Sequence, residues 1–157
     1  GVPAKALEIE ITESALVSDL TAANAALSRL DEMGIALSID DYGTGHSSLS
    51  HVRGLPVSCI KIDRSFVSGM LANTKDAAIV RSTIDLAKDL DISVVAEGVE
   101  TMEEWEALAD LGCHLAQGFL ISRPKPGTEL LEWLSGTGFM FRMDAKFEGS
   151  TPMPDFT

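Results

Sequence analysis

The sequence predicts an α/β fold in which a parallel sheet is covered by helices. Short apolar runs alternate with stretches of helical spacing from residue 6 to residue 136. Glycine, proline or capping residues separate most of these segments, as expected where strands and helices meet. Strands that alternate with helices pair in parallel, because each helix returns the chain to the edge of the sheet where the previous strand began.

Five strands and four helices account for this pattern. The strands are expected at residues 6–12, 35–40, 58–63, 92–97 and 114–120. The helices are expected at residues 20–34, 76–91, 101–112 and 126–136. Thr101 and Glu104 have the spacing of a capping box, and Gly34 and Gly112 follow helices as C-terminal caps. Residues 137–157 have no clean period, and we expect them to form a tail after a domain that ends at residue 136.

Two architectures could hold five parallel strands: an open doubly wound sheet and a (β/α)8 barrel. The dinucleotide-binding fingerprint of the open sheet requires three glycines in the pattern G-x-G-x-x-G. Here Gly43-Thr44-Gly45 is followed by His46-Ser47-Ser48, so the third glycine is missing. This weakens the open-sheet nucleotide-binding hypothesis.

Each expected strand carries one polar residue late on the face opposite to the helices. These residues are Glu10, Asp40, Lys61, Glu97 and Gln117. The carboxyl ends of parallel strands meet at one edge of the sheet, and barrel enzymes keep their active sites there. Asp41 follows Asp40 directly, and on a regular strand the two side chains would point to opposite faces. We therefore expect the strand to end at Asp40 and the backbone to turn at Asp41.

Carboxylates gathered at one edge need a compensating charge. Two of them about 4 Å apart repel by about 4 kcal/mol at an effective dielectric constant near 20. Glu10, Asp40, Asp41 and Glu97 are all oxygen donors, a ligand set that suits Mg²⁺, Mn²⁺ or Ca²⁺. The residues alone therefore predict a site for divalent cations.

Composition excludes several other classes of protein. The net charge of −12 argues against binding a nucleic-acid polymer through its phosphates. No apolar run approaches the roughly 20 residues of a membrane-spanning helix. Cys59 lies in an apolar strand and Cys113 is distant in sequence, so we expect a buried free thiol at Cys59 and no disulfide.

Four segments together resemble the EAL domain family of bacterial signalling proteins, the cyclic-di-GMP phosphodiesterases. They read EIEITES (8–14), IDDYGTGHSSLSHVRGLPVSCIKIDRSFV (39–67), VVAEGVET (94–101) and AQGFLISRP (116–124). The resemblance covers about residues 3–135, with the segments in the family's order. It implies a modified (β/α)8 barrel, similar to a TIM barrel, of which this chain carries about the last five strands.

The resemblance also implies roles for individual residues. Glu10, Asp40, Asp41 and Glu97 match metal ligands, with Asp40 shared between two ions and Glu97 also matching a general base. Lys61 matches the lysine that contacts the attacking water, and Glu100 and Gln117 match further pocket positions. Glu13 matches a glutamate that steadies the loop after the aspartate pair, a loop in which Gly43 and Gly45 permit unusual backbone angles.

The implied activity is hydrolysis of cyclic-di-GMP to linear pGpG with two Mg²⁺ or Mn²⁺ ions. The resemblance further implies a cytoplasmic domain that forms a homodimer and is joined to diguanylate cyclase or sensor modules, in a protein that other segments could tether to a membrane. The alternative is an EAL module that binds cyclic-di-GMP or a protein partner without cleaving the nucleotide.

The sequence departs from the family in two ways. Tyr42 stands where the family has phenylalanine and His46 where it has tyrosine, and both substitutions keep an aromatic ring. The Glu-Ala-Leu motif and the asparagine that follows it are absent from these 157 residues, and we expect them to precede residue 1. We therefore expect the isolated chain to be inactive or to depend on a partner.

Overall fold

The computed structural model describes residues 1–18, 20–44, 54–113 and 115–136. Its strands are β1 (Glu8–Thr12), β2 (Ala36–Tyr42), β3 (Cys59–Ile62), β4 (Ser93–Glu97) and β5 (Leu115–Gln117). Its α-helices are α1 (Glu13–Ser18), α2 (Leu20–Glu32), α4 (Arg64–Gly69), α5 (Thr74–Asp89), α6 (Met102–Asp110) and α7 (Gly127–Gly136), and a short 3₁₀ turn, η1, spans Ala4–Ala6. The predicted alternation of strands and helices is confirmed.

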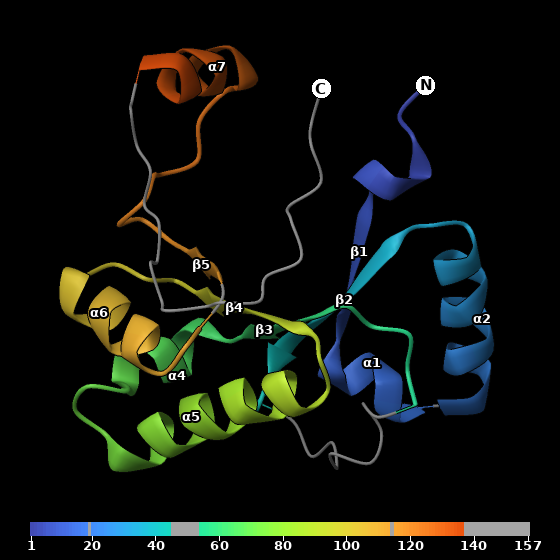
Figure 1. The fold of residues 1–157 in the computed structure, drawn as a ribbon, viewed down its shortest axis with the longest axis horizontal. Helices are drawn as coiled ribbons and strands as arrows, with labels where there is room; N and C mark the ends of the chain where they lie inside the picture. The colour runs from blue at the N-terminus through green and yellow to red at the C-terminus, as the bar shows by residue number, and fades with distance from the viewer. Residues whose placement is uncertain (19, 45–53, 114, 137–157) are drawn as a thin grey trace. The chain divides into compact units, whose positions relative to one another are not determined.

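The five strands form one parallel sheet in the order β1-β2-β3-β4-β5 (Figure 1). Each strand therefore pairs with its neighbour in the sequence, as in a barrel wall and unlike a doubly wound sheet, whose strand order reverses. The pairing places Thr12 beside Asp40 and Glu97 beside Gln117, so that the carboxyl ends of the strands lie at one edge. This order predicts that a single functional edge collects residues from all five strands.

The helices cover the face of the sheet that carries the apolar residues. Ile39, Ile60, Ile62, Val94 and Ala96 have no exposed surface on this face. The cluster around Ile39 and Ile60 includes side chains from α1, α2 and the segment before β3, namely Leu16, Leu27, Leu55 and Val57. Helix α5 lies against β3 and β4 in the same layer (Figure 1). Removal of these apolar side chains from water is the main stabilising term for such a layer.

Local sequence signals explain where the helices begin. The predicted capping box of α6 is present, because the Thr101 hydroxyl accepts from the Glu104 N–H and the Glu104 carboxylate accepts from the Thr101 N–H. Asn73 caps α5 by accepting from the Lys75 N–H, and Asp63 caps α4 by accepting from the Ser65 N–H. The two cysteines are free and buried, as predicted for Cys59, and burial raises the pKa of the Cys59 thiol to about 12.

Two segments for which the sequence predicted neither a strand nor a helix are helical. Residues 13–18 form α1 and residues 64–69 form α4, both too short to show a helical period in the sequence. The strand expected at residues 114–120 is shorter, because only Leu115–Gln117 pair with β4. After Gln117 the chain turns, and the N–H of Ile121 donates to the carbonyl oxygen of Gly118.

The prediction that the second strand ends at Asp40 was wrong. Strand β2 continues to Tyr42, with Ile39 beside Ile60 and Tyr42 beside Ile62. Between these partners β2 advances by three residues and β3 by two, so Asp40 and Asp41 together face Lys61 in a β-bulge. Asp41 adopts the left-handed conformation, with φ of 54°. A bulge therefore brings the second aspartate to the functional edge without ending the strand.

The chain folds as two compact units, Gly1–Pro124 and Lys125–Thr157. The domain boundary that we place after residue 136 stays a prediction, and the tail at 137–157 lies outside the described residues. None of the described helices is both long and apolar enough to cross a membrane.

Candidate functional site

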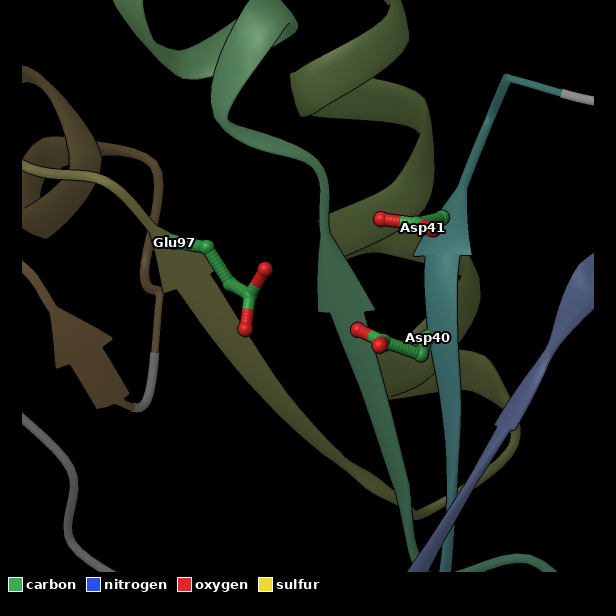
Figure 2. Close-up of side chains that lie close together, drawn as sticks. All are labelled: Asp40, Asp41 and Glu97. Atoms are coloured by element: carbon green, nitrogen blue, oxygen red, sulfur yellow. The ribbon is translucent and has the colours of Figure 1, made fainter.

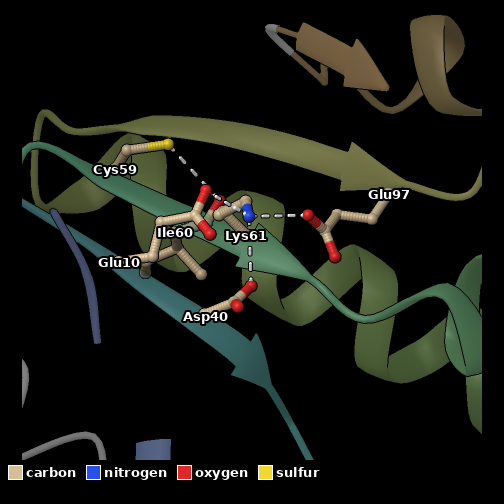
Figure 3. Close-up of polar contacts among 6 residues, drawn as sticks. All are labelled: Glu10, Asp40, Cys59, Ile60, Lys61 and Glu97. Atoms are coloured by element: carbon tan, nitrogen blue, oxygen red, sulfur yellow. Dashed lines mark hydrogen bonds and ion pairs between the residues drawn. The ribbon is translucent and has the colours of Figure 1, made fainter. Parts of the chain in front are cut away.

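Lys61 joins three of the predicted site residues. Its Nζ lies 2.6 Å from Glu10 Oε1, 2.7 Å from Glu97 Oε1 and 3.2 Å from Asp40 Oδ1 (Figure 3). These carboxylates come from β1, β4 and β2, and Lys61 comes from β3, which lies between β2 and β4. The four strands thus bring four of the polar residues predicted at the strand ends together around one ammonium group.

The environment of Lys61 keeps it positively charged. Its side chain is 9% exposed, and this burial by itself lowers the pKa of the ammonium group. The ion pairs with Glu10, Glu97 and Asp40 favour the charged form and outweigh burial, so that the pKa of Lys61 is raised above its ordinary value. Lys61 is therefore a fixed cation at neutral pH and a poor candidate for a general base.

Asp40, Asp41 and Glu97 form a group that could hold a metal ion. One carboxylate oxygen from each lies within 4.8 Å of the others, and Glu97 extends from β4 toward the aspartates of β2 (Figure 2). Asp40 Oδ1 is buried and forms an ion pair with Lys61 Nζ at 3.2 Å, but it accepts no hydrogen bond from the described residues. A buried oxygen with unused acceptor capacity is what a cation would coordinate.

The surroundings of Asp41 disfavour its charged form, whereas those of Lys61 favour the charged form. Loss of solvation and the nearby charges of Asp40 and Asp63 raise the pKa of the Asp41 carboxyl, and Lys61 offsets this only in part. Repulsion between adjacent carboxylates is thus only partly compensated at the bulge. A divalent cation would relieve it, because a positive charge favours the ionised form of both groups.

Glu10 and Gln117 lie at the same edge but do not belong to this group of three. The Glu10 side chain is half exposed and bonds to Lys61. Gln117 lies beside Glu97 in the sheet and is exposed. The structure therefore brings Glu10 to the predicted lysine and Gln117 to the predicted pocket.

Glu13 connects the site to the turn after β2. It is 3% exposed, and its Oε2 accepts from the N–H of Gly43 at 2.9 Å. Gly43 has φ of 99°, a conformation that side chains other than glycine rarely adopt. This contact agrees with the geometry expected of a residue that steadies the following loop, of which residues 45–53, including Gly45 and His46, lie outside the described residues.

Next to the carboxylates lies a pocket of about 180 Å³. Glu97 forms part of its wall, together with Glu100, Gln117, Phe119 and Arg64. Arg64 Nη2 and Glu100 Oε1 form an ion pair at 2.8 Å. No role for Arg64 or Phe119 was predicted from the sequence. The available signal was their position within the family-like segments 39–67 and 116–124, close to Lys61 and Gln117.

This arrangement suits chemistry on an anionic, oxygen-rich ligand. The carboxylate group can hold cations, Lys61 supplies a permanent positive charge, and the adjoining pocket has donors, acceptors and an aromatic ring. Metal-assisted hydrolysis of phosphate esters uses these components.

Comparison with known proteins identifies relatives in bacteria. The cyclic di-GMP phosphodiesterase NbdA of Pseudomonas aeruginosa is 43% identical over 145 residues, which cover 92% of this chain and 18% of that protein. The bifunctional diguanylate cyclase/cyclic di-GMP phosphodiesterase MucR of the same species is 46% identical over 125 residues, which cover 80% and 18%. The chain thus spans about a fifth of the length of the curated relatives that it matches.

Solved structures show the same fold. The PaMucR phosphodiesterase in complex with c-di-GMP matches with a TM-score of 0.80 and 43% identity, over 82% of this chain and 52% of that chain. Klebsiella pneumoniae BlrP1, solved with cyclic-di-GMP and either manganese or calcium, matches with a TM-score of 0.73 and 39% identity, over 78% and 31%. The five strands are therefore part of a TIM-like barrel. The sequence model of the EAL domain matches residues 1–124, and the chain belongs to the EAL domain family.

Proposed function

We propose that this chain forms part of a metal-dependent phosphodiesterase that hydrolyses cyclic-di-GMP to linear pGpG. The observation that carries the proposal is the group of Asp40, Asp41 and Glu97 oxygens within 4.8 Å of one another, beside the charged Lys61. The relatives named as cyclic di-GMP phosphodiesterases and the PaMucR complex with c-di-GMP support the choice of substrate.

The residues fit divalent cations, because every candidate ligand is a carboxylate and Asp40 Oδ1 has acceptor capacity to spare. We propose that Asp40, Asp41, Glu97 and Glu10 would together hold two Mg²⁺ or Mn²⁺ ions. The manganese complex of BlrP1 supports a divalent metal. When bound, such ions would lower the pKa of a water molecule and neutralise charge on the phosphate.

The protein's own groups supply positioning and proton transfer. We assign Lys61 to orienting the attacking water, because its ammonium is held by two short bonds and stays charged. We assign Glu97 to accepting the proton of that water. The water oxygen bonds to phosphorus, one phosphorus–oxygen ester bond breaks, and the proton passes to the departing 3′-oxygen.

The test uses the full-length protein, which supplies any barrel strands outside these residues. We expect the wild type to convert cyclic-di-GMP to pGpG with Mn²⁺ or Mg²⁺ and to lose activity in EDTA. Asp41→Asn and Glu97→Gln should each lower kcat by about 10²- to 10⁴-fold. Asp85→Asn, which removes an exposed carboxylate from α5, is the matched control and should keep the wild-type rate.

Two results would contradict the proposal. Full activity of both site variants would show that these carboxylates do not carry the reaction. Tight binding of cyclic-di-GMP by the wild type without turnover would instead favour the non-catalytic alternative.

We also propose that the full-length protein is a homodimer joined to diguanylate cyclase or sensor modules. We place this domain in the cytoplasm, in a protein that other segments could tether to a membrane. The two free cysteines support a reducing compartment. The two activities in the name of MucR support fusion to a cyclase in at least one relative.

A further inference from the structure

We propose that Arg64 and Glu100 together read the base of the nucleotide, as a guanine-specific pair in the pocket beside the carboxylate cluster. This inference rests on the proposed function, because it names the part of cyclic-di-GMP that the pocket holds. It adds a specificity-determining residue, Arg64, to the site.

The position of the pocket indicates which part of the substrate it takes. Glu97 belongs both to the carboxylate cluster and to the pocket wall. A phosphate held at the cluster would therefore leave its neighbouring nucleoside at the pocket. The lining also suits a base better than a second phosphate, since it includes a carboxylate and an aromatic ring, Glu100 and Phe119.

The backbone is shaped to let Arg64 reach this place. Gly98 has φ of 69°, and a Cβ added there would lie 2.3 Å from Arg64 Cγ and 2.7 Å from its Cβ and Cδ. The aliphatic part of the Arg64 side chain thus occupies the space beside the end of β4 that a side chain at position 98 would fill. Within the part of the chain that the structure describes, Arg64 is also the sole cationic residue that lines the pocket.

The ion pair sets a donor and an acceptor side by side. Nη2 and Oε1 lie 2.8 Å apart, and an Arg–carboxylate pair with this one contact keeps further guanidinium N–H donors and carboxylate acceptor capacity that the described residues leave to a ligand. The Watson–Crick edge of guanine presents an O6 acceptor next to the N1–H and N2–H₂ donors. Arg64 can donate to O6 while Glu100 accepts from N1–H and N2–H₂. Adenine has the N6–H₂ donor in place of O6 and an N1 acceptor in place of N1–H, so the contacts with Arg64 and Glu100 would both be lost.

The experiment measures kinetics of the full-length protein with Mn²⁺ on three substrates: cyclic-di-GMP, cyclic-di-AMP and bis(p-nitrophenyl) phosphate, which has no base. Arg64→Ala should raise KM for cyclic-di-GMP by about 10- to 100-fold with kcat within about threefold of wild type. The preference for cyclic-di-GMP over cyclic-di-AMP should fall by a similar factor. Turnover of the base-free diester should not change.

Two variants separate base reading from simpler roles. Arg64→Lys keeps the charge but not the planar fork, so it should restore little of the guanine preference. Arg81→Ala removes an exposed arginine from α5 and should match the wild type on all three substrates. Since the Arg64 side chain is 61% exposed, its removal should leave the circular dichroism spectrum unchanged.

Each possible outcome decides between the two proposals. If the wild type cleaves cyclic-di-GMP but Arg64→Ala keeps its KM and its guanine preference, the base-reading inference is overturned and the proposed function stands. Full rescue by Arg64→Lys, or an equal loss on the base-free diester, would make Arg64 a phosphate contact and also overturn it. A wild type that neither binds nor cleaves cyclic-di-GMP overturns both proposals.

Discussion

At the scale of single residues, Lys61 offsets carboxylate charge that bound cations would also offset. It neutralises part of the charge of Glu10, Asp40 and Glu97. Lys61→Met should therefore lower the unfolding free energy without metal by about 1–3 kcal/mol, less than for a fully buried pair because Glu10 is half exposed. It should also increase the thermal stabilisation that Mn²⁺ provides, because the cluster becomes more negative. Thermal unfolding of the full-length protein, with and without Mn²⁺, measures both effects.

Lys88→Met is the control for that experiment, since it removes an exposed lysine from α5. Its unfolding temperature should follow the wild type at every Mn²⁺ concentration. An unchanged Mn²⁺ response in Lys61→Met would show that the lysine and the metal do not share these carboxylates.

The sequence was sufficient to predict which residues form the site but not how all of them are arranged in space. Period-two reasoning put Glu10, Asp40, Lys61 and Glu97 on one face, and the structure joins them through Lys61. The same reasoning failed at Asp41, because a bulge is a local change of register that the alternation of side chains does not reveal. Arg64 was overlooked because its contact with Glu100 depends on how the start of α4 approaches the turn after β4.

At the scale of elements, Gly118 controls how the turn after β4 meets the end of β5. A Cβ at Gly118 would lie 2.1 Å from the carbonyl oxygen of Val99 and 2.3 Å from its nitrogen. Val99 also donates to Gln117 and accepts from Leu120, which ties the two segments together. Gly118→Ala should loosen this junction by about 1–3 kcal/mol, because backbone atoms have little room to move.

Amide hydrogen exchange is the direct measurement of that change. In Gly118→Ala the amides of Val99 and Leu120 should exchange about 5- to 150-fold faster than in the wild type. Gly54→Ala is the matched control, because no atom of the described residues lies within 4 Å of its added Cβ. Wild-type protection at Val99 and Leu120 in Gly118→Ala would mean that the close approach is not structurally important.

Elements with a full period in the sequence were predicted, and the short ones were not. Helices α5 and α6 and strands β3 and β4 match their expected ranges within two residues at each end. Helices α1 and α4 have too few residues to show a period, and tertiary contacts and the Asp63 cap define them instead. Strand β5 is short because the chain turns at Gly118 to bond with Val99.

At the scale of the whole molecule, the order of elements was enough to predict a parallel α/β sheet. The choice of a barrel needed more, since alternating strands and helices also build open sheets. The polar residue at the end of each strand and the motif resemblance favoured the barrel, and the solved structures confirm that fold. The sequential order of the strands gives the physical reason, because it leaves no reversal point among the described strands at which an open sheet would bind a ligand.

The edges of this sheet carry the last prediction. Strands β1 and β5 each have one paired neighbour among the described residues, and Ile9, Leu115 and Phe119 are 38%, 43% and 45% exposed. Unpaired edges with exposed apolar side chains favour association. The chain also covers only 52% of the matching PaMucR chain. We therefore expect residues 1–157 alone to self-associate in size-exclusion chromatography with light scattering and to show no turnover of cyclic-di-GMP with Mn²⁺, whereas the full-length protein is active. A monodisperse, fully active monomer of residues 1–157 would show that these edges need no partner.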